Sequence, residues 1–279
     1  MPELPEVQAH AERLTAAFSG AVLTRFTPLS FTALKTAVPS PDEAKGQTLD
    51  VVGRRGKHLL IDIGPLTFVV HLMQGGRLKP DSKQSAKPRF GVARWTFADN
   101  RALLLTEAGT ERRAGVWCSP RGEALARPPL DDLGPEATDV DADELAALFA
   151  AHPMRLHGFL RDQHRIAGLG RRLANEVCHR ARLSPFVSTG KLGVEGAGRV
   201  VTAIKDAIDE GLAYERSRDD MSSSADRPGR VHHRTGSPCP ECDDTIREVA
   251  YSSYTVHYCP TCQTGGTVLK DNTTSKFLK

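Results

Sequence analysis

Four cysteines near the end of the sequence have the spacing of a metal site. They form the pairs Cys239-Pro-Glu-Cys242 and Cys259-Pro-Thr-Cys262, separated by sixteen residues. Two tight turns of this kind present four thiolates tetrahedrally, which is the arrangement that Zn²⁺ prefers. Because all four positions are cysteine, none is left open for water, and we predict one structural zinc ion rather than a catalytic one. The alternative is a pair of disulfides, which a reducing compartment disfavours.

The first seven residues combine an amine with two carboxylates. They are Met1-Pro-Glu-Leu-Pro-Glu-Val7, so removal of Met1 gives Pro2 a free secondary amine. The pKa of an α-amino group is about 8, which makes it a nucleophile able to attack a sugar C1′ and form an iminium. Glu3 and Glu6 can supply acid–base function or orient the amine. An ordinary helix start, with proline and acids in its first turn, explains the same residues and is favoured on chemistry alone.

A basic stretch over residues 151–182 contains seven arginines and only two acidic residues. In its middle, Ile166-Ala-Gly-Leu-Gly170 places glycines where backbone N–H groups can approach an anion at a helix start. Lys57, in Gly53-Arg-Arg-Gly-Lys-His58, precedes a predicted strand and can contact a phosphate there. A solvated helix face and a solvated hairpin lysine are the plain alternatives. The charge, the glycine turn and the finger together favour a nucleic-acid backbone as partner.

The composition is that of an ordinary globular protein. The chain has 279 residues, a formal net charge of +3, 39% hydrophobic and 25% charged residues, which excludes collagen-like, coiled-coil and wholly disordered chains. No apolar run approaches the roughly 18 residues of a membrane span, and the first residues lack the basic and apolar regions of an export signal. We therefore expect a cytoplasmic protein of about two domains, with no membrane partner.

The elements of the first half are predicted to be one helix followed by strands. Apolar residues recur at helical spacing from Val7 to Phe18, and Gly20 supplies a stop. Short strands at close intervals then favour a β-sandwich or barrel over a parallel α/β sheet. The predicted strands are Val22–Phe26, Leu49–Val52, Leu59–Ile63, Thr67–Met73, Val92–Phe97 and Ala102–Thr106.

The second half is helical in pattern. After a proline-rich linker at 127–130, residues 131–144 carry seven acids and no base. Asp141 and Glu144 resemble a capping box at a helix start. Residues 215–238 are polar and rich in serine, so we expect a mobile segment before the finger. An apolar helical stripe is predicted from Val194, Ala197, Val201, Ile204, Ile208 and Leu212.

Six short motifs occur in a fixed order over essentially the whole chain. They are Pro2-Glu-Leu-Pro-Glu-Val7, Arg55-Gly-Lys-His-Leu-Leu60, His71-Leu-Met-Gln-Gly-Gly-Arg-Leu78, Leu133-Gly-Pro-Glu136, Asp162–Gly170 with Ala174-Asn-Glu176, and the finger segments Gly236–Cys239 and His257–Pro260. Together they resemble the bacterial formamidopyrimidine-DNA glycosylase and endonuclease VIII family, of which the chain looks like a divergent member.

The resemblance implies a fold and an activity. The fold would be α+β, with a helix and β-sandwich at 1–130, a helix–two-turn–helix domain at 131–235, and a four-cysteine zinc finger with a tail at 236–279. The protein would be a monomeric bacterial base-excision repair enzyme at the nucleoid, acting on damaged double-stranded DNA. It would flip the damaged base out of the duplex, remove it as a DNA glycosylase and cut the strand as an abasic-site lyase.

The resemblance also implies roles for individual residues. Pro2 would be the nucleophile, and Glu3 would protonate the sugar oxygen. Glu6 and Glu176 would support that pocket, and Lys57 would grip a backbone phosphate. Six motifs in order are far more specific than one, so for Pro2 and Lys57 they outweigh the plain alternatives above.

Two expected phosphate contacts are altered. Arg171 stands where the family has an asparagine, and its guanidinium can still donate to phosphate with a different reach. Tyr254 stands where the family finger has an arginine, which removes a cation and adds a ring able to stack. The DNA contacts expected by resemblance are Met73, Gln74, Arg112, Arg113, Gly168, Gly170, Arg171 and Tyr254.

The positions that fill the space left by a flipped base also differ from the family. Met73 lies one position early for the void-filling methionine, with Gln74 in the expected place. Ala114, after Arg112-Arg113, replaces the void-filling phenylalanine. These losses predict a substrate other than 8-oxoguanine, or weak activity on it.

Two further functions compete with a glycosylase. One is a family member specialised for DNA binding or damage sensing, with little excision. The other is a zinc-ribbon module that binds proteins, which would have no salt-dependent DNA affinity. The presence of Pro2, Glu3, Glu6 and Lys57 together favours the enzyme, because a pure binding protein has little need for all four.

Overall fold

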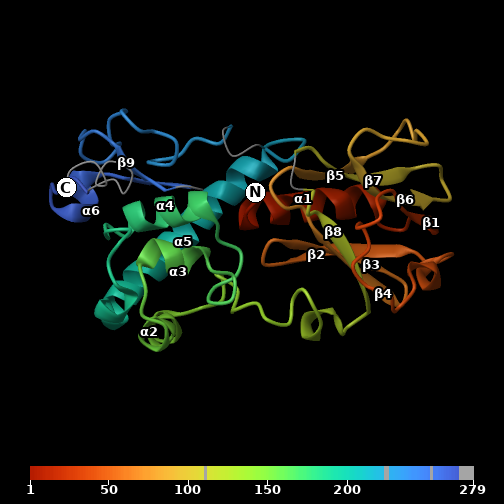
Figure 1. Cartoon of the computed structure of the whole chain (residues 1–279), viewed down its shortest axis with the longest axis horizontal. Helices are drawn as coiled ribbons and strands as arrows, with labels where there is room; N and C mark the ends of the chain where they lie inside the picture. The colour runs from red at the N-terminus through yellow and green to blue at the C-terminus, as the bar shows by residue number, and fades with distance from the viewer. Residues whose placement is uncertain (110–111, 223–225, 252–253, 270–279) are drawn as a thin grey trace. The chain divides into compact units, whose positions relative to one another are not determined.

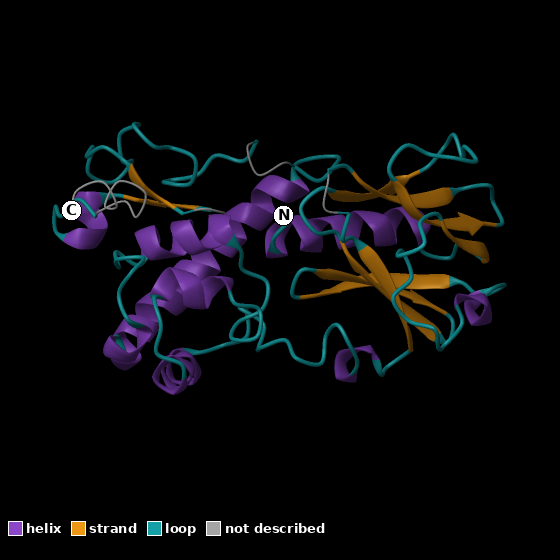
Figure 2. Ribbon diagram, in the orientation of Figure 1, coloured by secondary structure: helices purple, strands orange, loops and turns teal. Residues whose placement is uncertain are grey.

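The structure is a computed structural model that describes residues 1–109, 112–222, 226–251 and 254–269 (Figure 1). The chain divides into two compact units, Met1–Leu133 and Gly134–Lys279, which are taken in turn. A helix and two sheets form the first, and helices with a small hairpin form the second (Figure 2). This confirms the predicted α+β class. Within the described ranges, no helix has both the length and the apolar character needed to cross a bilayer.

Helix α1 spans Leu4–Phe18 and confirms the predicted N-terminal helix. Pro5 lies in its first turn, where the missing N–H costs no hydrogen bond. Gly20 follows with φ +82°, a left-handed conformation that a glycine adopts without strain, and turns the chain away. The buried apolar side chains repeat at helical spacing and include Leu4, Val7, Ala11, Leu14 and Phe18.

Among the described residues, the strands of the N-terminal unit form two four-stranded antiparallel sheets. The first has the order β1 (Leu23–Pro28), β6 (Gly91–Phe97), β7 (Ala102–Glu107) and β5 (Gly76–Pro80). The second has the order β2 (Leu49–Arg55), β3 (His58–Ile63), β4 (Leu66–His71) and β8 (Gly115–Pro120). Each of the predicted strands is present. Sequence analysis missed β5, in which Leu78 stands between two basic residues, and β8, whose ends are glycine and proline.

The sheets are joined by an aromatic core, as expected for a sandwich. The Phe26 ring of β1 lies 5.4 Å from the Phe68 ring of β4, and Trp95 of β6 lies 5.9 Å from Phe68, as measured between centroids. These contacts cross from one sheet to the other. Phe18 of α1 packs on Phe97 of β6 at 5.3 Å, so the helix that carries the N-terminus is fixed to the sandwich. Large rings of this kind dominate core energetics.

Before the finger, the described residues of the C-terminal unit form the helices α2 (Ala142–Ala151), α3 (Leu156–Arg161), α4 (Arg171–Arg180) and α5 (Gly193–Arg216). The capping box at the start of α2 is confirmed, since the Glu144 N–H donates to the Asp141 carboxylate at 2.9 Å and Glu144 accepts from the Asp141 N–H at 3.2 Å. Helices α2 and α4 both pack against α5. Short 3-10 turns lie at Pro41–Ala44, Ala124–Ala126 and Thr189–Lys191.

The buried stripe of α5 includes Ala197, Ile204 and Ile208 of the predicted positions, whereas Val201 and Leu212 are only partly buried. Val194 is 53% exposed at the helix start, so its place in the stripe was wrong. The helical period holds, but the side that meets α2 and α4 also uses small residues that allow close approach. The buried positions of α5 are Gly196, Ala197, Val200, Ala203, Ile204, Ala207, Ile208, Gly211 and Glu215.

The finger closes the described chain. Strand β9 (Arg247–Ala250) pairs antiparallel with β10 (Thr255–Tyr258), and the short helix α6 (Pro260–Thr264) follows. Gly265, with φ +59°, ends α6 in the left-handed conformation typical of a helix C-terminus. The core of the finger consists of Val231 and Ile246 together with the four cysteines of the finger.

Two glycines of α5 provide a matched test of packing. A Cβ on Gly198 would meet only the Ala142 Cβ at 3.7 Å, an ordinary contact, whereas a Cβ on Gly196 would lie 2.7 Å from the Leu192 Cβ. We expect Gly198→Ala to raise the unfolding free energy by about 0.5–1 kcal/mol through helix propensity. Gly196→Ala should lower it by about 1–3 kcal/mol through overpacking. Urea unfolding followed by far-UV circular dichroism measures both, and equal effects would contradict this packing.

Candidate functional site

Two buried carboxylates and a buried proline stand together at the start of α1. Glu3 is 5% exposed, Glu6 is 4% exposed, and Pro2 is buried. The Glu3 N–H belongs to the Pro2–Glu3 peptide and donates to the Glu6 carboxylate at 3.0 Å. This bond fixes the orientation of the peptide that carries the Pro2 ring. The helix start and the chemical site are therefore one structure, so the two interpretations of the sequence are compatible.

Lys57 lies in the tight turn between β2 and β3. Gly56 has φ +55°, and the Arg54 guanidinium donates to its carbonyl at 3.0 Å, which closes the turn. Lys57 is 7% exposed, so it is not a solvated hairpin lysine. A buried ammonium must be paired or face an anion, which keeps a phosphate-binding role open to it.

A histidine pair follows Lys57 directly. His58 of β3 and His71 of β4 are cross-strand partners, and their ring centroids are 4.5 Å apart. Burial first, then the neighbouring positive groups, lowers the pKa of His58 to about 3 and that of His71 to about 4. Both rings are therefore neutral near pH 7. The motif analysis quoted both residues but assigned neither a role, because only the strand register reveals the pair.

The predicted contacts Met73 and Gln74 lie in a turn after β4. Met73 has φ +52° and its sulfur lies 2.6 Å from His71 Nδ1, while Gln74 is exposed. The turn is tight, since a Cβ on Gly75 would lie 2.0 Å from the Ala108 carbonyl oxygen. The structure thereby brings this turn beside the segment that follows β7.

That neighbouring segment carries the predicted contacts Arg112 and Arg113. Both are exposed, and Arg112 has φ +42°. Ala114 is only 2% exposed, and its N–H donates to the Glu107 carboxylate at 2.7 Å. Because Ala114 is buried and has only a methyl group, it cannot insert a side chain into a DNA helix.

The glycine turn before α4 is organised by a side chain that sequence analysis did not single out. Gln163 Nε2 donates to the carbonyls of Arg161 at 3.0 Å and Leu169 at 2.8 Å, and its Oε1 accepts the Gly168 N–H at 3.1 Å. Gly168, with φ +101°, supplies a left-handed bend, and its N–H is already paired. Gly170 begins α4, whose first N–H groups lack helical partners. The predicted contact of an anion with the Gly168 N–H is therefore disfavoured, because that N–H already binds Gln163.

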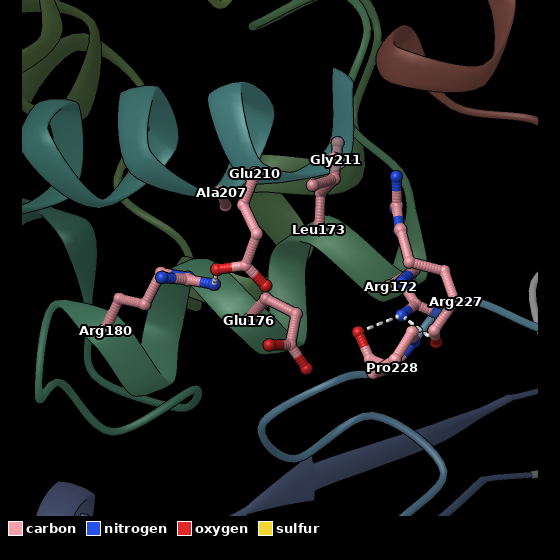
Figure 3. Close-up of a pocket in the computed structure, with 9 residues that line it drawn as sticks. All are labelled: Arg172, Leu173, Glu176, Arg180, Ala207, Glu210, Gly211, Arg227 and Pro228. Atoms are coloured by element: carbon pink, nitrogen blue, oxygen red, sulfur yellow. Dashed lines mark hydrogen bonds and ion pairs between the residues drawn. The ribbon is translucent and has the colours of Figure 1, made fainter. Parts of the chain in front are cut away.

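Glu176, predicted to support catalysis, binds the backbone of a loop. Its carboxylate accepts the N–H groups of Arg230 at 2.9 Å, Val231 at 3.1 Å and His232 at 2.9 Å. On the same helix, Arg172 donates to the carbonyls of Arg227 and, at 2.8 Å, of Pro228. Figure 3 shows these side chains of α4 around a small polar pocket that faces α5. Helix α4 thereby binds both ends of the 227–232 loop, through Arg172 at residues 227–228 and through Glu176 at residues 230–232.

The described part of the 215–238 segment, which was predicted to be mobile, makes hydrogen bonds to its neighbours. Residues 227–232 are bound to α4, as described above. In addition, Glu215 is fully buried, and its carboxylate accepts hydrogen bonds from the backbone N–H of Ser222, at 3.2 Å, and from the Ser222 hydroxyl. The Tyr214 hydroxyl donates to the Asp226 carbonyl at 2.9 Å. Polar groups of this segment therefore serve as hydrogen-bond partners within the C-terminal unit. Residues 223–225 lie outside the described ranges.

The four finger cysteines form the predicted structural zinc site. Their sulfurs all lie within 4.8 Å of one another, with Cys242 at 3.4 Å from Cys259 and 3.5 Å from Cys262. Tetrahedral bonds of about 2.3 Å to zinc require sulfurs about 3.8 Å apart, so the donor set fits the ion. His179 Nε2 of α4 lies 3.3 Å from Cys239 Sγ. The other two cysteines of the chain, Cys118 and Cys178, are buried.

The comparisons with known proteins agree on one family. Residues 1–117 match "Formamidopyrimidine-DNA glycosylase N-terminal domain", and residues 236–265 match "Zinc finger found in FPG and IleRS". A formamidopyrimidine-DNA glycosylase of Thiobacillus denitrificans is 32% identical over 275 residues, which cover 94% of this chain and all of the relative. An uncharacterized formamidopyrimidine-DNA glycosylase-like protein of Mycobacterium tuberculosis is 43% identical over 153 residues, or 53% of this chain and 94% of the relative.

A solved structure shares the fold. The Lactococcus lactis formamidopyrimidine DNA glycosylase, bound non-covalently to DNA with an AP site, superposes with a TM-score of 0.81 at 20% identity. The match covers 94% of this chain and 99% of the other.

The buried histidine pair predicts a pH-dependent stability of the N-terminal unit. The folded-state pKa values of His58 and His71, about 3 and about 4, lie below the ordinary 6.5, so unfolding takes up protons between these limits. The stability contributed by the neutral pair is complete above about pH 6.5 and is lost as the pH falls toward 4. The loss is about 1.4 kcal/mol per pH unit for each histidine.

Tryptophan fluorescence during urea unfolding measures this effect, because the two tryptophans of the chain, Trp95 and Trp117, both lie in the N-terminal unit. Between pH 7.5 and 5, the wild-type unfolding free energy should fall, and His58→Gln should reduce the slope. His164→Gln, at an exposed position in the other unit, is the matched control. An identical slope in all three proteins would contradict the assignment.

Proposed function

Because the chain belongs to the formamidopyrimidine-DNA glycosylase family, we propose that it removes oxidised or ring-opened bases from double-stranded DNA and cuts the strand at the resulting abasic site. The observation that carries this proposal is the buried start of α1, where Pro2, Glu3 and Glu6 stand together. A terminal amine beside two carboxylates removed from water suits nucleophilic and acid–base chemistry at a sugar carbon.

The reaction begins when the damaged base leaves the stack, since C1′ is out of reach inside a duplex. After removal of Met1, the lone pair of the Pro2 nitrogen attacks C1′, and the bond from C1′ to the base breaks. The base leaves with the bonding electrons and takes up the proton that the Pro2 nitrogen gives up. The bond from C1′ to the ring oxygen then opens to give an iminium, and Glu3 supplies the proton that the ring oxygen takes up. Loss of a C2′ proton expels the 3′ phosphate, a second elimination expels the 5′ phosphate, and water releases Pro2.

The other predicted residues position the substrate. Glu6 fixes the Pro2–Glu3 peptide through its 3.0 Å hydrogen bond and so aims the nucleophile. Lys57, in the rigid turn before β3, grips a backbone phosphate as a compact point charge. Glu176 acts at a distance by holding the 230–232 backbone. The zinc ion stabilises the finger fold, because four thiolates fill its coordination sphere.

The lesion is proposed to differ from 8-oxoguanine. The space left by a flipped base must be filled to keep the duplex stacked, and unstacking costs a few kcal/mol. At the positions that correspond to the family's wedges, this chain has the polar, exposed Gln74 and the buried Ala114. The same observation favours a second candidate function, in which the protein binds or senses damaged DNA and excises little.

Covalent trapping tests the nucleophile. With an oligonucleotide containing an abasic site, borohydride should reduce the iminium and leave a stable protein–DNA adduct on a denaturing gel. Pro2→Gly should strongly reduce the adduct, because it replaces the secondary amine of the proline ring with a primary amine that the ring no longer holds in place. Glu3→Gln should slow excision of a base by about a hundredfold or more, which is the usual value of a positioned general acid.

The control for trapping is a protein extended at its N-terminus, which keeps the Pro2 ring but converts its nitrogen into an amide. It should bind the abasic oligonucleotide and form no adduct. A yield of adduct from the extended protein equal to that from wild type would refute the proposed nucleophile and leave the binding function.

A lesion panel tests the substrate. Wild type should remove 8-oxoguanine about tenfold or more slowly than a ring-opened purine in the same duplex, equivalent to about 1.4 kcal/mol of transition-state stabilisation. Gln74→Met should raise the rate on 8-oxoguanine by restoring an apolar wedge, and Gln47→Met, at another exposed glutamine, should not. Equal wild-type rates on both lesions would sink the idea.

A further inference from the structure

The finger hairpin ends in a pair of stacked tyrosines. The pairing of β9 with β10 continues to the Tyr251 N–H, which donates to the Tyr254 carbonyl at 2.8 Å. Residues directly opposite in an antiparallel pair share a face. Their rings accordingly lie 12° from parallel with centroids 4.7 Å apart. Residues 252–253 between them lie outside the described ranges.

The second face of Tyr254 is taken by an arginine. The guanidinium carbon of Arg161, at the end of α3, lies 4.0 Å from the centroid of Tyr254. A guanidinium and a ring at these distances would collide on one face, so Arg161 and Tyr251 lie on opposite faces. His157, one turn before Arg161, is also nearly parallel to Tyr254 at 6.0 Å. Tyr254 therefore offers no open face to a DNA base, contrary to the stacking role considered from sequence.

The other end of α3 is held in the same way. Arg155 donates to the Tyr251 hydroxyl at 3.1 Å, and its guanidinium carbon lies 5.2 Å from the Phe186 ring. Among the described residues, neither Arg155 nor Arg161 has a carboxylate oxygen within 4.0 Å. His157 between them adds no charge, because burial lowers its pKa to about 3.

The hairpin is itself fixed to α4. The fully buried Asn175 accepts the His257 N–H of β10 at 3.2 Å, and its amide nitrogen lies 2.8 Å from His232 Nδ1. The two tyrosines therefore contact α3 from a hairpin whose strand β10 is hydrogen-bonded to α4. Holding a long side chain in one place removes much of the entropy cost of using it.

We propose that Arg155 and Arg161 form a binding site for DNA backbone phosphates, with Tyr251 and Tyr254 as the residues that position them. The Tyr254 ring contacts the flat face of the Arg161 guanidinium and leaves its N–H edge available for two parallel hydrogen bonds to phosphate oxygens. Arg155 gives one N–H to the Tyr251 hydroxyl and keeps its other N–H groups for a phosphate. The cation that the family places in the finger hairpin is in this chain supplied by α3 and held by the hairpin. The inference rests on the proposed DNA-binding function and extends it to two residues to which no role had been given.

Salt-dependent binding tests the site. The affinity of the full-length zinc-loaded protein for a duplex with a tetrahydrofuran abasic analogue is measured by fluorescence anisotropy over a range of NaCl concentrations. Each phosphate contact contributes about 0.9 to the slope of log K against log salt. Arg155→Gln and Arg161→Gln should each reduce the slope by about one, and the double variant by about two. Lys205→Gln is the matched control, since it removes one charge from a lysine paired with Asp209 at 2.7 Å.

The tyrosine variants separate positioning from charge. Tyr254→Phe keeps the ring and should bind as wild type does, whereas Tyr254→Leu should weaken binding and lower the slope although it removes no charge. Zinc content and circular dichroism verify that each variant is folded. Slopes for both arginine variants equal to that of Lys205→Gln would overturn the site. If the wild-type protein neither binds DNA nor forms the covalent adduct, the proposed function is overturned. If the wild-type protein forms the adduct and the arginine variants have the same salt-dependence slope as wild type, only this inference is overturned.

Discussion

The C-terminal unit depends on one constraint, which is that a polar group removed from water must find a partner. Helix α4 carries buried polar side chains that are paired with other segments of the chain: Arg172 and Glu176 with the 227–232 loop, and Asn175 with the finger hairpin. Glu176 alone satisfies three backbone N–H groups. Removing such a carboxylate would leave three buried donors unpaired, at a cost of about 1–3 kcal/mol each. A ten-residue helix therefore determines where a long loop and the finger lie.

The N-terminal unit applies the same constraint to chemistry. The orphan N–H groups at a helix start need acceptors, and the carboxylates that meet this need are also the acids that a sugar reaction requires. The sandwich beneath α1 supplies rigidity through aromatic contacts such as Phe18 with Phe97. Under the proposed function, stability and chemistry share Glu3 and Glu6, so a change at either should affect both.

Local patterns in the sequence were sufficient for much of this structure. Helix α1, six strands, the capping box of α2 and the four-thiol zinc site follow from short-range spacing. Features that depend on distant partners were missed. Strand β5 forms because β7 pairs with it, and the backbone of residues 230–232 is held by Glu176 of α4, which lies more than fifty residues earlier in the chain. Gln163 and Asn175 gave no signal alone, since an amide shows its role only through its partners.

The two cysteines outside the finger have a consequence for the chemical reactivity of the whole chain. Burial raises the pKa of Cys118 to about 12 and that of Cys178 further still, so neither is a thiolate near neutral pH. Alkylating reagents attack thiolates. Labelling of the native protein with such a reagent will therefore count only the sulfurs of the finger, and its rate will report directly on how firmly the metal is held.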